Sequence, residues 1–325
     1  MENKQLAQYL NDFTSLRRDA KNGGAPHKPI LLLSLIQAFE NGFITDKRIY
    51  ILPELIGFFK SNWQFFVQTD HDARFALPFY HMTTEPFWRL IPKEGCEIWV
   101  QSKGAMRSLS NLQTAVKYAE IDDSLTNFLK DATSRDVLRM AILEKYFPNI
   151  PPQYSSDLGL GFVNDIRNQI LEESPTEYVT EIRKLKTRLS KEAFEEEVVM
   201  RGGIFKREVP RNYGYTCCIS GLRIDATFNS STLIEACHIK PFSVSFDDTL
   251  SNGITLTPTL HTAFDNGFFT LSEKFEVIIS KNLTETSSPQ GIMQYHGRKI
   301  LLPNSINCYP NLESIRWHQE NKFEK

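Results

Sequence analysis

The sequence predicts an α+β protein of two domains: a mostly helical N-terminal domain and a C-terminal domain of short strands and a helix. Three observations favour this fold class. Apolar residues recur at helical spacing near the N-terminus, a cluster of prolines follows residue 146, and a series of β-like segments separated by turn residues follows residue 210. At 325 residues the chain is long enough for two domains of about 100–200 residues each.

The N-terminal half is predicted to consist of helices interrupted by one mixed segment. Leu6, Leu10 and Phe13 repeat at helical spacing and predict a first helix, which a loop with two glycines and two prolines ends. Three further helices are expected over residues 29–41, 51–62 and 124–146. The stretch 72–97 is rich in aromatic residues and prolines, which indicates short strands and turns.

The proline cluster YFPNIPP and the following SSDLGLG indicate the exit from the first domain. We therefore place the first domain at residues 1–150, a charge-rich helical linker at residues 151–195 and the second domain at residues 196–325. In the second domain, strands are expected around residues 213–223, 232–241 and 268–280. A short helix is expected over residues 257–267.

Composition places the chain among globular proteins and limits its partners. Hydrophobic residues make up 41% and charged residues 23%, and no apolar run approaches the ~20 residues that span a bilayer. The polar start MENKQLAQYLNDF lacks the apolar segment of a signal peptide, so we expect a cytoplasmic protein with no membrane partner. A net charge of −2 means that attraction to nucleic acid must come from local basic patches. The five scattered cysteines form no CxxC pair and are expected to be reduced and mostly buried.

One stretch of the second domain brings together residue types that suit metal and acid–base chemistry. A predicted strand ends near His238, and the following loop carries Asn252. His261 follows nine residues after Asn252, and Asp265 follows four residues after His261. Residues four apart are neighbours on a helix, so His261 and Asp265 can share one divalent ion. The stretch therefore predicts a metal site beside a base.

Over about residues 200–275 the chain resembles the HNH nucleases, whose fold is two antiparallel strands and a helix packed around one metal ion. The resemblance implies that His238 is the general base and that Asn252 orients either this base or the loop backbone. It also implies that His261 and Asp265 bind the metal. In such a site a cation neutralises the scissile phosphate and the departing 3′ oxygen while the base removes a proton from water. Histidine, with an ordinary pKa of about 6.5, suits the second task near neutral pH.

Cys237 departs from the commoner HNH pattern, in which a histidine or an aspartate precedes the base. Either Cys237 is a thiolate ligand, or the ion is held by His261, Asp265, water and the substrate phosphate. Glu235 is a further candidate ligand. We favour the arrangement without the thiolate, with Mg²⁺ or Mn²⁺ as the ion, because hard cations keep several waters and use few protein oxygens.

Several other polar residues of the second domain are expected to have no part in the chemistry. A lone histidine is more often a core or surface residue than a ligand, and His318 is assigned accordingly. Asp247 and Asp248 are expected to lie in an exposed loop between the two halves of the motif.

Three segments of the first domain carry a second resemblance: GGAPHKPILLLSLIQAF, ALPFYHMTTEPFWRL and YAEIDDSLTNFLKDATSRDVLRMAILEKYF. Together they resemble the sulfur-binding domain that precedes the HNH module in phosphorothioate-dependent restriction enzymes, and the resemblance covers most of residues 5–147. In that family a Tyr-Pro-Phe turn forms an apolar sulfur cavity. The match here is Leu77-Pro78-Phe79, with His81 two residues further on. Leucine in place of tyrosine keeps the predicted cavity apolar but removes a hydroxyl.

This second resemblance implies that the first domain binds the DNA backbone. Sulfur in place of a non-bridging phosphate oxygen is larger and less hydrated, so an apolar cavity can prefer it while cations hold the remaining charge. His27 and Lys28 match the positions of basic residues that hold the backbone. Arg17, Arg18 and Arg74 are further phosphate-binding candidates.

Taken together, the two resemblances imply a metal-dependent endonuclease that cuts phosphorothioated double-stranded DNA, as a restriction enzyme does in defence. A homodimer would fit double-strand cleavage with one site per chain. Two alternatives stay open. The first domain could instead hold a flipped, modified base in an aromatic cage of Tyr80, Phe87 and Trp88. The chain could also be a DNA-binding protein with a decayed nuclease module, although His238 and His261 are both present.

Overall fold

The computed structural model describes residues 2–19, 24–149, 158–224, 233–286 and 291–324. The chain divides into two compact units. Unit 1 comprises Met1–Asp165 and Leu189–Met200, and unit 2 comprises Ile166–Arg188 and Arg201–Lys325. The predicted division into a recognition domain (1–150), a linker (151–195) and a nuclease domain (196–325) stays a prediction.

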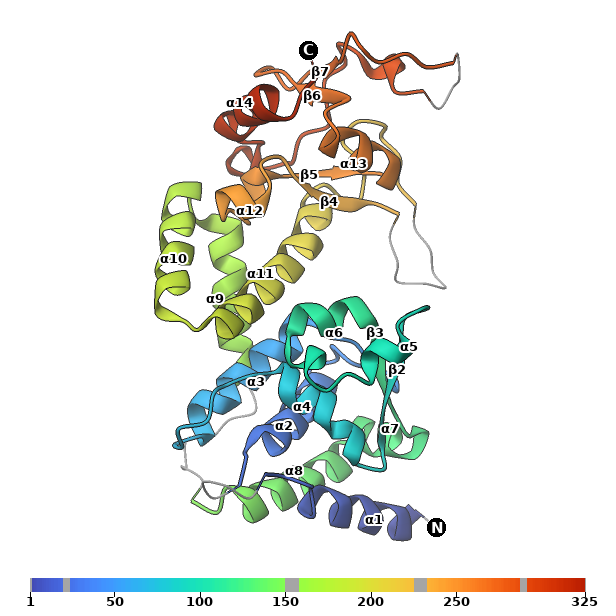
Figure 1. Cartoon of the computed structure of the whole chain (residues 1–325), viewed down its shortest axis with the longest axis vertical. Coiled ribbons are helices and arrows are strands. Elements are labelled where there is room, and N and C mark those ends of the chain that lie inside the picture. The colour runs from blue at the N-terminus through green and yellow to red at the C-terminus, as the bar shows by residue number, and fades with distance from the viewer. Residues whose placement is uncertain (1, 20–23, 150–157, 225–232, 287–290, 325) are drawn as a thin grey trace. The chain divides into compact units, whose positions relative to one another are not determined.

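Unit 1 is mostly helical and contains one three-stranded antiparallel sheet (Figure 1). Its helices are α1 (Glu2–Thr14), α2 (His27–Glu40), α3 (Pro53–Phe66), α4 (Ala76–His81), α5 (Glu97–Val100), α6 (Leu109–Ala115), α7 (Asp123–Lys130) and α8 (Ala132–Tyr146). Two 3₁₀ turns are η2 (Met82–Thr84) and η3 (Ala105–Arg107). The strands β1 (Arg48–Ile49), β2 (Trp88–Pro92) and β3 (Val116–Ile121) lie in the order β1-β3-β2.

Helix α2 forms the centre of the unit 1 core. Its residues 30–36 are at most 1% exposed, because α3, α4, α7 and α8 all pack against it. A helix that is apolar on every side has to be covered on every side, so the leucine-rich sequence of α2 accounts for this arrangement. The predicted helix over residues 29–41 is confirmed, with its start two residues earlier at His27.

Two predictions for unit 1 need correction. Residues 76–81 form helix α4 where strands and turns were expected, and strand β2 begins only at Trp88. The single helix predicted over residues 124–146 is two helices, α7 and α8. The break falls at Asp131, whose side chain caps α8 by accepting a hydrogen bond from the Ser134 backbone amide at 2.8 Å.

Unit 2 combines long helices with two small antiparallel sheets. Its helices are α10 (Pro175–Arg188), α12 (Phe242–Ser245), α13 (Pro258–Asp265) and α14 (Leu312–Asn321). Helices α9 (Leu158–Glu172) and α11 (Lys191–Asn212) each have residues in both units. The strand pairs are β4 (Glu235–His238) with β5 (Gly253–Leu256), and β6 (Phe269–Leu271) with β7 (Val277–Ile279). The 3₁₀ turns are η4 (Leu250–Asn252), η5 (Met293–Tyr295) and η6 (Ile306–Cys308).

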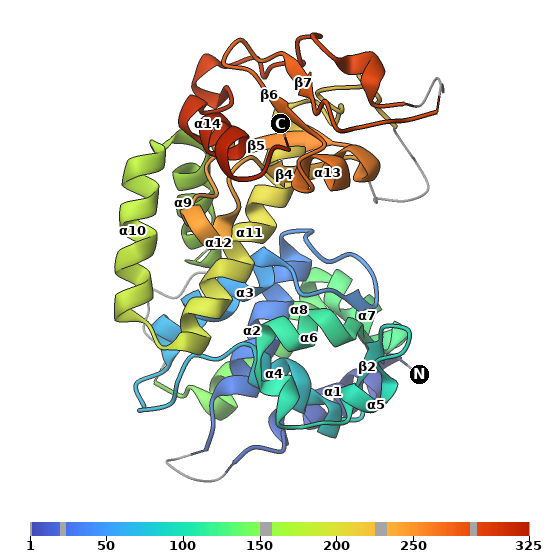
Figure 2. The same ribbon diagram turned by 45° about the horizontal axis from the view of Figure 1, so that its top comes forward.

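Strands β4 and β5 form a ββα arrangement with helix α13, which lies beside the strand pair in both views (Figures 1 and 2). Helix α13 begins where the Thr257 hydroxyl accepts from the Leu260 amide and Pro258 occupies the first turn. The strand–loop–helix order predicted from the sequence is confirmed here. The strand predicted around residues 213–223 is wrong, because only one bridge, between Thr216 and Arg223, forms there.

His318 joins helix α14 to the rest of this part of unit 2. Its ring stacks on Phe264 with 3.8 Å between ring centroids. Nε2 donates to the Phe264 carbonyl at 3.1 Å, and Nδ1 accepts from the Thr270 hydroxyl at 2.8 Å. Burial lowers the pKa of His318 to about 4, so the imidazole is neutral near pH 7. His318 is a core histidine, as expected.

Two further expectations from composition can be compared with the structure. All five cysteines are free, and four of them are buried: Cys217, Cys218, Cys237 and Cys308. None of the helices in the described ranges is long and apolar enough to cross a membrane.

Candidate active site

The ββα arrangement collects the four residues that the sequence assigned to chemistry. His238 ends β4, Asn252 ends η4, and His261 and Asp265 lie on α13. The strand register places His238 opposite Gly253, and α13 packs against both strands. Within this frame the four residues fall into two groups, one around His238 and one around His261.

The His238 ring is held on two sides. Its Nε2 lies 2.8 Å from Oδ1 of Asp248. Its face stacks on Phe205 of α11, with 3.9 Å between ring centroids and 7° between ring planes. The His238 side chain remains 22% exposed, whereas that of Asp248 is 1% exposed. One face of the imidazole is therefore packed and its Nε2 is hydrogen-bonded, and the ring still reaches the surface where a substrate can approach.

The expectation that Asp247 and Asp248 lie in an exposed loop is wrong. The two residues are 4% and 1% exposed. Oδ1 of Asp247 accepts a hydrogen bond from the Thr249 amide at 2.8 Å, and burial raises the pKa of the Asp247 carboxyl. Asp248 faces His238. The loop turns inward, and its acidic residues become part of the site.

Asn252 explains why the loop turns inward. Its side chain is fully buried, and its Oδ1 accepts from the Lys240 amide at 3.0 Å. Its Nδ2 donates to the carbonyls of Lys240 and Asp247, both at 2.9 Å. Asn252 thus fastens both ends of the loop. Of the two roles that the HNH resemblance implied, these contacts favour orientation of the loop backbone.

Gly253 leaves room for the ring that supports His238. A Cβ at this position would lie 2.7 Å from Cγ2 of Val209 and 2.9 Å from Cζ of Phe205, closer than real Cβ atoms approach. Because Phe205 is the residue stacked on His238, a side chain at position 253 would displace the stack. The Asn-Gly pair therefore has two separate purposes: the asparagine holds the loop and the glycine admits Phe205.

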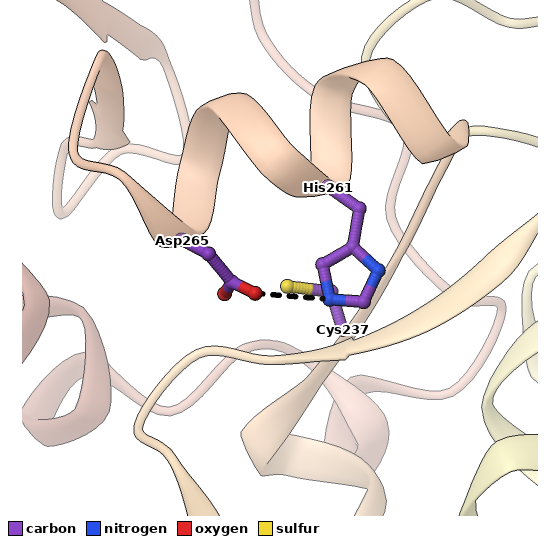
Figure 3. A group of neighbouring side chains, drawn as sticks. All are labelled: Cys237, His261 and Asp265. Atoms are coloured by element: carbon purple, nitrogen blue, oxygen red, sulfur yellow. Dashed lines mark ion pairs between the residues drawn. The ribbon is translucent and has the colours of Figure 1, made fainter.

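The second group surrounds His261. Figure 3 shows His261 and Asp265 projecting from one helix toward Cys237, and the ligand atoms of these three residues lie within 4.8 Å of one another. Nε2 of His261 is 3.5 Å from Oδ2 of Asp265. Nδ1 of His261 lies 2.8 Å from Oε2 of Glu235. This hydrogen bond places the proton on Nδ1 and leaves the Nε2 lone pair for a metal ion, the usual arrangement of a metal-binding histidine.

The chemistry of this cluster fits a divalent metal ion. The His261 side chain is 26% and the Asp265 side chain 58% exposed, so water and a phosphate oxygen can complete the coordination. Cys237 is fully buried, which raises the pKa of its thiol well above the usual range, and a coordinated ion would remove that proton. The cluster fits an ion with or without the thiolate. Glu235 contacts His261 and is not among the three converging ligand residues.

In unit 1 the segment predicted to form a sulfur cavity lies on helix α4. The matched segment is helical, which corrects the expected turn. Pro78 is buried, and Leu77 and His81 are half-buried. Burial lowers the pKa of the His81 imidazole. The charges of three neighbouring cations lower it further: Lys28, Arg107 and Lys103.

Neither His27 nor Lys28 presents an exposed cation. Lys28 is 6% exposed, forms an ion pair with Glu85 and donates to the Thr84 hydroxyl at 2.7 Å. The His27 ring packs edge-on against Trp63 at 4.6 Å between ring centroids. Burial lowers the pKa of His27 to about 4, so this ring is neutral near pH 7. The sequence placed both residues in the loop before the apolar helix, whereas they belong to the first turn of α2.

The three predicted arginines are spread over unit 1. Arg17 is exposed, and its charge acts on Lys28. The Arg18 guanidinium lies 4.4 Å over the Tyr146 ring, and Arg74 pairs with Glu192 at 3.7 Å. Arg17 therefore stays an exposed candidate, whereas Arg74, two residues before α4, is held by an acidic partner.

Two exposed cations near α4, Lys103 and Arg107, were missed from the sequence. They lie in and beside η3, which packs against α4 only in the folded chain. The aromatic residues proposed as a base cage, in contrast, belong to the core: Tyr80 is 8%, Phe87 1% and Trp88 2% exposed. An aromatic cage at the surface is therefore not formed by these three residues.

Comparison with known proteins identifies part of the chain. The HNH endonuclease family matches residues 217–272, a range that contains β4, β5 and α13. No curated protein matches. Among solved structures, a modification-dependent TagI restriction endonuclease is similar at 20% identity and a TM-score of 0.26, over 36% of this chain and 36% of that enzyme. The chain thus carries an HNH endonuclease domain, and its four predicted chemical residues lie inside the matched range.

Proposed function

We propose that the HNH domain makes this chain a restriction endonuclease that hydrolyses phosphodiesters in double-stranded DNA, and that unit 1 selects DNA carrying a backbone phosphorothioate. One observation carries the nuclease part. A single ββα arrangement holds a packed, partly exposed histidine, His238, and a metal-ligand cluster that includes His261 and Asp265. A base beside a cation site is what hydrolysis of an anionic ester requires.

In the proposed reaction His238 removes a proton from water, and the water oxygen attacks phosphorus. The bond between phosphorus and the 3′ oxygen breaks, and the departing oxygen takes a proton from solvent. A divalent ion, Mg²⁺ or Mn²⁺, held by His261 and Asp265 would supply charge neutralisation at the phosphate and at the departing oxygen. Glu235 keeps the His261 ring oriented, and Asn252 keeps the loop beside His238 closed.

The phosphorothioate part of the proposal is supported by the surroundings of α4. Leu77 is a half-buried apolar residue of α4 next to the buried Pro78, and His81 lies one turn further along the same helix. The exposed cations Lys103 and Arg107 act on His81 and can attract the phosphate backbone. Sulfur leaves water more readily than oxygen does, so an apolar surface flanked by cations favours a thiolated phosphate.

A cytoplasmic location and a homodimer are parts of the same proposal. The substrate would be DNA within the cell. Each chain has one HNH domain, so cutting both strands in a single binding event would require two chains.

The recognition step is tested by DNA binding to the full-length chain carrying His238→Ala, which should bind without cutting. We expect a phosphorothioate duplex to bind roughly tenfold tighter than the same duplex with ordinary phosphate, about 1.4 kcal/mol. The preference should persist as salt rises because it reflects desolvation. Leu77→Glu, at a half-buried position, should erase it by placing a carboxylate against the backbone.

Substitution of the two cations near α4 should weaken DNA binding without removing the preference for phosphorothioate. Lys103→Ala and Arg107→Ala are expected to weaken binding of both duplexes alike and to lower the salt slope by about 1 each. The matched control is Lys130→Ala, which replaces another exposed lysine of unit 1. It should change neither the affinity for either duplex nor the ratio of the two affinities. Equal affinity for the two duplexes at every salt concentration would remove phosphorothioate from the proposal and favour recognition of another modification.

A further inference from the structure

The loop between β4 and β5 delivers a buried carboxylate to the His238 ring. We infer that Asp248 is a positioning residue, which holds the His238 proton on Nε2 and so turns Nδ1 toward the attacking water. This inference rests on the proposed function, in which His238 is the base. It adds a residue that the HNH motif spacing did not indicate.

The hydrogen bond itself determines which nitrogen acts. Oδ1 of Asp248 lies 2.8 Å from Nε2 of His238, and an ionised carboxylate can only accept. Nε2 therefore carries the proton of the neutral ring, and Nδ1 keeps the lone pair that a base needs. Phe205, stacked on the ring at 3.9 Å between centroids, prevents the ring from tilting out of this position.

The other oxygen of Asp248 argues for a role beyond packing. Asp248 is 1% exposed, and its Oδ2 has no hydrogen-bond partner among the described residues. A buried polar atom without a partner is costly, and most proteins avoid it. Asparagine or an apolar residue would fill the same space without a buried charge. A carboxylate at this buried position is explained if its charge is used when His238 becomes protonated.

The backbone of the loop is strained in order to bring Asp248 inward. Phe246 has a φ of +59°, a left-handed conformation that bulky residues rarely adopt. Its amide donates to the Phe242 carbonyl at 2.8 Å, and the chain then turns toward the interior. The next carbonyl, that of Asp247, accepts from Nδ2 of Asn252. Strain of this kind persists only where surrounding contacts over-determine it, and here hydrogen bonds from Asn252 and Thr249 to Asp247 hold the segment that carries Asp248.

The role of Asp248 in the reaction follows from the bonds that form and break and from where the proton goes. An O–H bond of water breaks, an N–H bond forms at Nδ1 of His238, the water oxygen bonds to phosphorus, and the bond to the 3′ oxygen breaks. The departing oxygen takes its proton from solvent. His238 is then an imidazolium, and the Asp248 carboxylate at Nε2 stabilises its positive charge without taking the proton.

The kinetic test compares Asp248→Asn with Asp247→Asn in the full-length chain. Both changes remove a buried carboxylate from the same loop, but the side-chain hydrogen bond to His238 comes from Asp248. Asp248→Asn is expected to lower kcat by roughly 10²- to 10⁴-fold, with KM and DNA affinity within about twofold of the parent. Asp247→Asn should lower kcat far less. An Asp248→Asn variant that retains kcat within about threefold of the parent overturns the inference.

A second measurement needs neither cleavage nor a variant of Asp248. The ¹⁵N chemical shifts of His238, assigned by comparison with His238→Gln, report which nitrogen carries the proton. We expect the proton on Nε2 in the neutral ring of the parent protein, and a parent in which Nδ1 carries it contradicts the inference. If the parent cleaves no DNA at all, the proposed function fails, while the ¹⁵N shifts still decide whether Asp248 orients His238.

Discussion

His238→Ala is expected to lower the rate of DNA cleavage by roughly 10²- to 10⁴-fold, because a general base acts in the chemical step. DNA affinity should stay near that of the parent, since the imidazole does not have to hold the backbone. Alanine also leaves Asp248 without its donor and is expected to cost about 1–3 kcal/mol of stability. Single-turnover cleavage, DNA binding and thermal unfolding, measured on the same preparation, separate these effects.

Two companion variants make the His238 experiment specific. His238→Gln keeps an amide that can donate to Asp248, so it should recover stability but not cleavage. His296→Ala changes another histidine of unit 2, one that is exposed and accepts only from the Ile279 amide among the hydrogen bonds described, and it should leave the cleavage rate unchanged. Cleavage by His238→Ala at a rate close to the parent would remove His238 from the role of base.

The next largest effects are expected at the metal cluster. His261→Ala and Asp265→Ala should each abolish most cleavage and weaken Mn²⁺ binding by more than the roughly 10–100-fold that is typical of residues that only orient a ligand. Glu235→Gln should weaken Mn²⁺ binding only by an amount within this roughly 10–100-fold range. The reason is that Glu235 contacts Nδ1 of His261 and not Nε2, which faces the metal site. Calorimetric titration with Mn²⁺ measures all three affinities.

Controls at the same cluster decide between its two ligand arrangements. Glu273→Gln, an exposed acid outside the cluster, should leave Mn²⁺ affinity unchanged. Cys237→Ser should lower affinity for Zn²⁺ more than for Mn²⁺ if the thiolate is a ligand, and should lower neither if it is not. Unchanged Mn²⁺ affinity in both His261→Ala and Asp265→Ala would place the ion elsewhere.

The ββα site could be predicted because local sequence determines it. The spacing between His261 and Asp265 fixes a shared helix face, and the Asn-Gly pair marks the loop that ends at β5. The buried position of Asp248 could not be predicted in this way. It depends on the side-chain hydrogen bonds of Asn252 and on the αL turn at Phe246, and an acidic residue between turn residues ordinarily lies in solvent.

Unit 1 shows the same limit at longer range. The apolar sequence of α2 predicts a buried helix, and one forms. From the same sequence Lys28 is predicted to be an exposed cation. Its partner Glu85 lies 57 positions away, and only the fold brings the two residues together. The position of Lys103 and Arg107 near α4 could not be predicted either, because η3 contacts α4 only through tertiary packing. Whether a charged residue is exposed or paired depends on such tertiary contacts, and a single sequence does not show these contacts.

The central claim, that this chain cuts DNA according to a backbone modification, is tested most directly by cleavage of matched plasmids. Two plasmids of identical sequence, one phosphorothioated and one not, would be incubated with the parent chain in Mg²⁺ and in Mn²⁺, with His238→Ala as the inactive control. The proposal predicts double-strand cleavage of the phosphorothioated plasmid, little cleavage of the other, and none by the control. Equal cleavage of both plasmids, or cleavage of neither, would contradict it.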